Sequence, residues 1–296
     1  MPNLALKKKQ NLSAFRRLAI GTWKTAYDPS VYGSLSLRVD KAEAYIEEFR
    51  EKTGRRLTFT HMMAKAVGHV LATNPDANAI LRFNTLYLRE QVRVFFQVVM
   101  KDPETGEIDL SGVTVDEPQD KDLHAIINEF EGSVKTVRSG KGESEKTRGL
   151  FKVIPSLLLN AFVNLIGFLS FALNFDLRWM NVPRDPFGSA MVTNIGSLGL
   201  QEAYVPLVPY SYVPLLLAVG AVCDTAVVED KKIVPGRTLE ICATFDHRVL
   251  DGAHVARMAT TLRDFFEDPY THFGPIEAAP AKAEEAAPEV AGGEAA

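Results

Sequence analysis

The sequence predicts an α/β protein, in which strands and helices alternate along the chain. Stretches that alternate apolar and polar residues, as half-buried strands do, include residues 31–39 and 110–115. Longer stretches carry apolar residues at helical spacing, among them residues 59–73 and 253–266. The 296 residues are 46% hydrophobic and 24% charged, which is ordinary for a globular protein of one large domain or two small ones.

The predicted elements follow one another in a regular order. In the first half, strands are predicted at residues 31–39, 86–88, 92–100 and 110–115, and helices at residues 41–52, 59–73 and 120–137. In the second half, a helix is predicted at residues 253–266 and strands at residues 190–195 and 233–245, with a hairpin turn at 230–232. Residues 213–222 and 226–228 together resemble one long bent strand. Gly54 ends the first long helix.

The two ends of the chain differ from this central part. Residues 1–12 carry three consecutive lysines and are expected to form a flexible basic arm, either solvated or in contact with a partner. Residues 277–296 are almost all Ala, Glu, Pro and Gly, which bury too little apolar surface to fold, so a disordered tail is expected. The folded domain is therefore expected to span residues 13–276, with an apolar insertion at 150–180.

Composition excludes several classes of protein. A net charge of −4 argues against general nucleic-acid binding. Cys223 and Cys242 lie in apolar strand-like runs without a CxxC pattern, so inert core thiols are expected. His61 and His69 are eight residues apart on one predicted helix, which is no metal-ligand spacing, so solvated or capping histidines and no metal are expected. The N-terminus lacks the apolar core of a signal peptide, which favours the cytoplasm.

Residues 246–252, with the sequence DHRVLDG, have the features of a catalytic loop. They follow an apolar strand and precede an amphipathic helix, so His247 lies where a strand ends and a loop begins. The unperturbed pKa of histidine lies nearest neutrality, which suits a base that activates a substrate's own nucleophile. Asp251 is a candidate to hold this loop, and Gly252 allows a tight backbone before the helix. A buried core histidine is the alternative interpretation.

The pattern DHRxxDG at residues 246–252 resembles the active-site signature of the dihydrolipoamide acyltransferases, the E2 components of 2-oxoacid dehydrogenase complexes. Chloramphenicol acetyltransferases share a shorter form of this signature. The run MVTNIGSLG at residues 191–199 resembles a second landmark of the E2 family. The resemblance covers roughly residues 14–275. It implies a two-layer α/β sandwich with a mixed sheet, the chloramphenicol acetyltransferase-like fold.

The resemblance also implies roles for single residues. His247 would be the general base, and Thr193 would donate to an oxyanion, a contact typically worth about 3–4 kcal/mol. Taken alone, Thr193 is an ordinary β-branched strand residue. In the family an arginine near the N-terminus pairs with the aspartate that matches Asp251. Arg16 and Arg17 both fit that place, and two surface arginines are the alternative.

Four further residues complete the expected site. Asp246 and Gly252 would support the His247 loop, as their places in the signature imply. Asn194 and Gly196 would bind substrate, because they belong to the second landmark.

Residues 153–175 carry no charged side chain, and this is the main departure from the family. Their length would allow a membrane span. Three interpretations compete: packing in the core or at a subunit interface, contact with a membrane surface, or a span. Pro155, Gly167 and three asparagines weaken the last of them.

The resemblance implies a CoA-dependent acyltransferase that moves an acyl group between CoA and a thiol such as dihydrolipoamide. It implies a homotrimer, or a larger assembly of trimers, with the site between subunits. No lipoyl domain is evident in the sequence, so either a lipoyl group comes in trans or the acceptor is a different thiol, alcohol or amine. The expected partners are 2-oxoacid dehydrogenase components or a lipoyl domain in trans. A non-catalytic E2-like scaffold and a small-molecule O-acetyltransferase are the alternatives.

Overall fold

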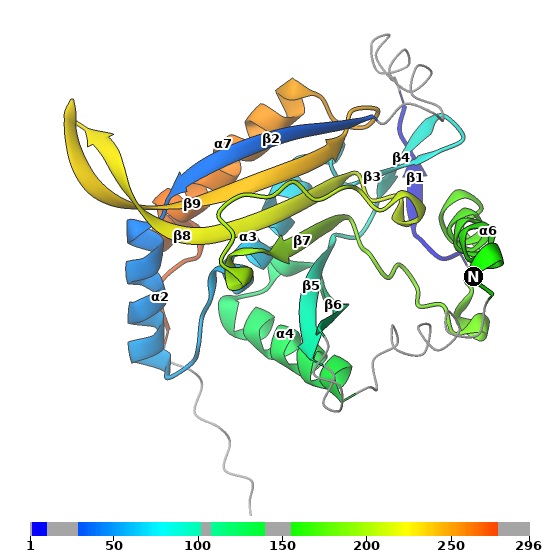
Figure 1. Cartoon of the computed structure of the whole chain (residues 1–296), viewed down its shortest axis with the longest axis horizontal. Coiled ribbons are helices and arrows are strands. Elements are labelled where there is room, and N and C mark those ends of the chain that lie inside the picture. The colour runs from blue at the N-terminus through cyan, green and yellow to red at the C-terminus, as the bar shows by residue number, and fades with distance from the viewer. Residues whose placement is uncertain (1, 11–28, 102–107, 140–154, 278–296) are drawn as a thin grey trace, which may run out of the picture.

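The computed structural model describes residues 2–10, 29–101, 108–139 and 155–277. Its centre is a six-stranded sheet in the order β2-β9-β8-β7-β5-β6 (Figure 1). β7 pairs in parallel with β5 and β8, and the other pairs are antiparallel, so the predicted mixed sheet is confirmed. Its strands are β2 (Ser30–Arg38), β5 (Arg93–Lys101), β6 (Ile108–Asp116), β7 (Ala190–Asn194), β8 (Leu215–Glu229) and β9 (Lys232–Asp246).

β8 and β9 form a long hairpin that closes where the sequence predicts a turn. Asp230 and Lys231 both have positive φ values, of 46° and 64°, as in the two-residue turns that match the twist of a hairpin. The long bent strand predicted over residues 213–222 and 226–228 is confirmed as one continuous strand, β8. Its pairing with β9 shifts register between Val219 and Val222, so the ladder is irregular at this point.

Four helices cover one face of the sheet and bury its core. They are α2 (Asp40–Thr53), α3 (Phe59–Thr73), α4 (Leu123–Arg138) and α7 (Gly252–Glu267), and the short helix α8 (Pro269–His272) follows α7. The strands alternate as a half-buried sheet requires. On β5, Val94 and Phe96 are buried with the helices, whereas Phe95 packs in a separate cluster with Met191 and Leu216. Both faces of the sheet therefore carry apolar side chains.

A second, three-stranded sheet changes the picture of the N-terminus. Its order is β1-β4-β3, with bounds Leu6–Lys8, Thr85–Arg89 and Ala79–Arg82. The sequence predicts a flexible arm at residues 1–12, but in the structure Leu6 to Lys8 form a strand that pairs with β4. Leu4 is buried with Ile80 and Phe171, so apolar burial and strand pairing order a segment that its three lysines made look solvated.

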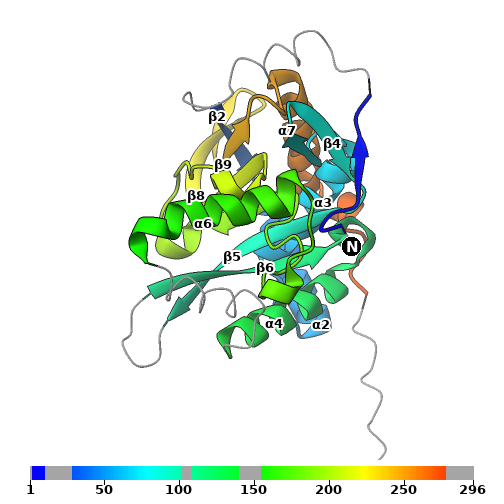
Figure 2. The same ribbon diagram turned by 90° about the vertical axis from the view of Figure 1, so that its right-hand side faces the viewer.

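The described part of the apolar segment is helical from Ser156 to Ala172 and changes from α to π geometry after Gly167. α6 (Ser156–Gly167) is followed by a π-helical turn, η2 (Phe168–Ala172), and the pair runs along a side of the molecule away from the other helices (Figure 2). Leu158 and Leu165 on α6 are 55% and 53% exposed, whereas Phe171 and Ala172 are buried. None of the helices in the described ranges is long and apolar enough to cross a membrane.

Four short 3-10 helices complete the described chain: η1 (Pro118–Asp120), η3 (Arg178–Met180), η4 (Gly196–Leu198) and η5 (Pro209–Ser211). Residues 278–296 of the tail expected at 277–296 lie outside the described residues.

His61 is buried in the core, which differs from the solvated or capping role predicted for it. Its side chain is 5% exposed, and its ring meets Phe130 edge to face, with 5.1 Å between centroids. Burial, aided by the positive charges of Arg55 and Arg56, lowers the pKa of His61 from 6.5 to about 4.

This pKa shift predicts a loss of stability in mild acid. Between pH 6.5 and pH 4 the unfolded chain binds a proton at His61 that the folded chain does not bind. The free energy of unfolding therefore falls as the pH is lowered through this window, by at most about 3 kcal/mol from this residue. His61→Leu should flatten that part of the pH profile in urea titrations. An unchanged profile in the variant would show that His61 does not couple folding to pH.

Candidate active site

The end of β9 holds the His247 loop in place through backbone and side-chain contacts. The Asp246 carboxylate accepts hydrogen bonds from the Arg248 backbone N–H at 2.8 Å and from its Nη2 at 2.7 Å. The amides of Val249 and Leu250 both donate to the Asp246 carbonyl oxygen, each at 2.9 Å. Asp246 therefore holds the loop through its side chain and through its carbonyl oxygen. The pair with Arg248 is bidentate and charge-assisted, which makes it a strong contact.

His247 itself is anchored through its backbone and is half-buried. Its amide donates to the carbonyl oxygen of Pro29, just before β2, at 2.9 Å. The residue lies at the end of a strand, and although it is half-buried as a whole, its Nδ1 atom is buried. This position suits a group that exchanges protons with a ligand, and it differs from that of a core histidine.

Asp251 closes the loop as the N-cap of α7. Its Oδ1 accepts hydrogen bonds from the amides of Ala253 and His254, at 3.0 and 3.1 Å, and contacts His254 Nδ1 at 2.6 Å. His254 Nε2 lies 3.2 Å from Asp76, and Asp76 also pairs with Lys9. A chain of polar contacts therefore joins the N-terminal strand region to the start of α7, beside the His247 loop.

Sequence reasoning missed this chain of contacts. Lys9 was expected in the basic arm, and His254 is a residue of the predicted helix at 253–266. In the structure His254 contacts Asp251 directly, and Lys9 contacts Asp76 on the other side of His254. Arg16 and Arg17, the predicted partners of Asp251, lie outside the described residues. A Cβ atom at position 252 would meet no atom within 4 Å in this chain, so no close contact requires a glycine at this position.

Thr193 lies near the end of β7, and its neighbours shape a tight turn. The Asn194 side chain donates to Thr60 Oγ1 at 3.1 Å and accepts from the Ser197 amide at 3.0 Å. A Cβ on Gly196 would lie 2.4 Å from the carbonyl oxygen of Gly220 on β8, so only glycine allows this approach. The described contacts of Asn194 and Gly196 thus fix the loop that follows Thr193.

Strand pairing sets the distance between Thr193 and His247 within one chain. Thr193 pairs with Ala218 on β8, and Ala218 pairs with Cys242 on β9. His247 lies five residues beyond Cys242 and two strands away from Thr193. With about 3.4 Å per residue along a strand and 4.8 Å between strands, the two residues are roughly 15–20 Å apart. They cannot contact the same reacting carbonyl from one chain.

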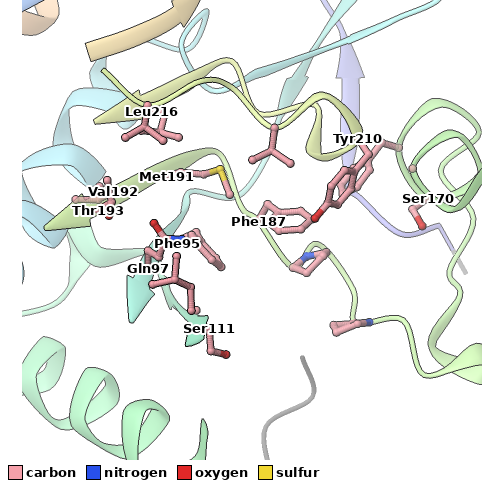
Figure 3. A pocket seen from close by; sticks show the side chains of 18 of the residues that line it. Phe95, Gln97, Ser111, Ser170, Phe187, Met191, Val192, Thr193, Tyr210 and Leu216 are labelled. Atoms are coloured by element: carbon pink, nitrogen blue, oxygen red, sulfur yellow. The ribbon is translucent and has the colours of Figure 1, made fainter. Parts of the chain in front are cut away.

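A cavity of about 350 Å³ opens beside Thr193, on the sheet face opposite the four helices. Phe95, Met191 and Leu216 line it from the strands, and Phe171 and Phe187 line it from the segment between α6 and β7 (Figure 3). Tyr210 reaches it from the loop before β8, and burial raises the pKa of this tyrosine, which keeps its hydroxyl protonated. None of the described lining residues carries a charge.

The described residues offer no other obvious catalytic centre. Cys242 is buried, and burial raises the pKa of its thiol, as expected for an inert core cysteine. Within the same ranges, no group of three His, Cys, Asp or Glu side chains is arranged to hold a metal ion.

Comparison with known proteins supports the resemblance drawn from the motifs. Residues 187–273 match the family of 2-oxoacid dehydrogenase acyltransferases, over its catalytic domain. The chain is 22% identical, over 219 residues, to the dihydrolipoyllysine-residue acetyltransferase component of the acetoin cleaving system of Bacillus subtilis. That match covers 74% of this chain and 44% of the relative, so the chain spans less than half the length of this relative.

Solved structures confirm the predicted fold. The dihydrolipoamide acetyltransferase of Azotobacter vinelandii superimposes with a TM-score of 0.61 at 20% identity, over 88% of each chain. The cubic core of the pyruvate dehydrogenase multienzyme complex gives a TM-score of 0.60 at 20% identity, over 90% of this chain and 94% of that one. The chain therefore has the α/β fold of these acetyltransferase cores.

The N-cap at Asp251 predicts a measurable effect on stability. Asp251→Ala should lower the free energy of unfolding by about 1–2 kcal/mol, because two helix amides and His254 lose their acceptor. Asp251→Asn, still a good N-cap, should retain most of that stability. Denaturant titration measures both, and equal losses in the two variants would contradict the capping role.

Proposed function

We propose that this chain is a CoA-dependent acyltransferase of the E2 type, because residues 187–273 match the catalytic domain of that family. It would move an acyl group between CoA and a thiol such as dihydrolipoamide, in the cytoplasm. The observation that carries the proposal is the placement of His247, held by Asp246 and by the N-cap at Asp251 on a loop between β9 and α7.

The proposed reaction is direct transfer, without an acyl-enzyme. His247 takes the proton from the acceptor thiol, and the thiolate sulfur forms a bond to the acyl carbonyl carbon. The Thr193 hydroxyl donates a hydrogen bond to the oxyanion of the tetrahedral intermediate. When the intermediate collapses, its bond to the CoA sulfur breaks, and CoA leaves as the thiol after taking the proton back from His247. The reverse reaction uses the same steps.

The two catalytic residues would come from neighbouring subunits. A separation of roughly 15–20 Å within one chain rules out joint action there. We therefore propose a homotrimer, or a larger assembly of trimers, in which His247 of one subunit faces Thr193 of the next. A solved structure similar to this chain forms the cubic core of a multienzyme complex. Exposed apolar residues on α6, Leu158 and Leu165, are available for a subunit contact or a membrane surface.

The remaining residues would position these groups. Asp246 and Asp251 hold the loop, Gly252 begins α7, and either Arg16 or Arg17 would complete the support of Asp251. Asn194 and Gly196 would place the turn after Thr193 against the substrate. Acyl-CoA would be a substrate and not a resident cofactor, with no metal involved, and a lipoyl group would be supplied in trans by a 2-oxoacid dehydrogenase component.

The proposed mechanism predicts that His247→Ala abolishes transfer. Turnover should fall at least about 10³-fold, because general-base catalysis contributes about 10²–10⁴-fold and the thiol is mostly protonated at neutral pH. Thiol release from acyl-CoA, with dihydrolipoamide as acceptor, measures the loss. Asp122→Ala is a matched control, because Asp122 caps α4, on another element than the loop.

Each outcome of this assay has a clear meaning. Activity that disappears in His247→Ala and persists in Asp122→Ala supports the proposal. Chloramphenicol is the second acceptor in the assay, and transfer to chloramphenicol alone would favour a small-molecule O-acetyltransferase. Wild-type rates in His247→Ala would overturn the role of His247, and a wild-type protein inert toward each acceptor would favour the scaffold.

A further inference from the structure

We propose that the cavity beside Thr193 binds the hydrocarbon chain of the acyl group, so that the preferred substrate carries an extended or branched apolar acyl chain and not acetyl. This inference rests on the proposed acyl transfer. It assigns a substrate class to a cavity that the mechanism above does not use.

The chemistry of the lining selects the ligand. Aromatic and aliphatic side chains from four strands, β5, β6, β7 and β8, form one wall, and the segment from α6 to β7 and the loop before β8 form the other. The absence of charged side chains among the described lining residues disfavours the phosphates of CoA and any carboxylate. A hydrocarbon is the part of an acyl-CoA that gains free energy by entering such a site.

The size of the cavity exceeds what acetyl needs. Its volume of about 350 Å³ lies within the range of small-molecule sites. An acetyl group carries a single methyl group beyond its carbonyl carbon, so it would leave most of the cavity unfilled. Each further methylene that is buried would strengthen binding about fourfold.

The position of the cavity fits an acyl chain whose carbonyl lies at Thr193. Figure 3 shows Thr193 at one end of the lining and Ser170 at the other. An acyl carbon held at the Thr193 hydroxyl would therefore direct its chain toward η2. At that far end Ser170 is 3% exposed, and its Oγ has no hydrogen-bond partner among the residues that the structure describes.

The far wall is built by residues of the uncharged run at 153–175 and of the loop before β8. Gly167 packs so closely on the loop before β8 that a Cβ there would lie 2.8 Å from the carbonyl oxygen of Tyr210. Arg82 Nε donates to the carbonyl oxygen of Ala172 at 2.8 Å, which ties η2 to the smaller sheet. The wall is therefore fixed, so the cavity has a defined depth.

The test compares variants that differ in the space left at the far end. Ser170→Leu fills that end and removes an unpaired hydroxyl, and Ser170→Ala is the matched control that removes the hydroxyl without filling it. Val205→Phe narrows the cavity from a different loop, which keeps the test valid if Ser170→Leu fails to fold. Acetyl-CoA, isovaleryl-CoA, hexanoyl-CoA and decanoyl-CoA are the substrates, with dihydrolipoamide as acceptor.

The expected result is a change in chain-length preference. Wild type and Ser170→Ala should prefer the longer or branched chains by kcat/KM. Ser170→Leu or Val205→Phe should lower the ratio of kcat/KM for decanoyl-CoA to that for acetyl-CoA by about tenfold or more, because several methylenes lose their site. An equal ratio in all folded variants would overturn the proposal.

Two further readouts separate this inference from its premise. Calorimetric binding of the same acyl-CoAs to His247→Ala protein needs no turnover. In one outcome, affinity rises with the length of the acyl chain and falls when Ser170→Leu is added, while the wild type transfers no acyl group. That combination would support the cavity as an acyl-chain site and refute the acyltransferase reaction. The lipoyl arm is also a hydrocarbon, and a variant that raises only the KM for dihydrolipoamide would assign the cavity to that arm and overturn the acyl assignment.

Discussion

The pairing register of β7, β8 and β9 is the constraint on which the rest of the account depends. It places Thr193 level with Ala218 and Cys242, and it places His247 beyond the end of β9. Hydrogen-bonded strands cannot slide past one another without exchanging their buried and exposed faces, so this separation is fixed by the core. The proposed base, His247, and the proposed oxyanion donor, Thr193, are held so far apart in one chain that they can cooperate only across a contact between two chains.

The same sheet explains how the second face gains a ligand site. Helices bury one face, and the apolar residues of the other face, Phe95, Met191 and Leu216, are covered by loops and by η2. Loops pack less regularly than helices, and a cavity remains between them and the strands. The residues that close this cavity at the far end, Gly167 and Ser170, belong to the uncharged run at residues 153–175.

The sequence was a good guide wherever a periodic pattern ran over many residues. The hairpin of β8 and β9, the four covering helices and the strand-loop-helix around His247 all follow from apolar spacing and turn residues. β1 and β3 were missed, because three or four residues show no period. The uncharged run at 153–175 was ambiguous, since absence of charge does not reveal that a helix ends at Gly167. The contact between His254 and Asp76 joins residues 178 positions apart, and no local pattern encodes it.

Complementation between two inactive variants tests the shared site most directly. His247→Ala and Thr193→Val, purified separately, are unfolded together, refolded as a mixture and assayed for acyl transfer. If His247 of one chain acts with Thr193 of another, about a quarter of the sites in random assemblies regain both residues, and activity returns to about a quarter of wild type. Activity that stays at the level of the separate variants, in a mixture that has reassembled, would contradict the account.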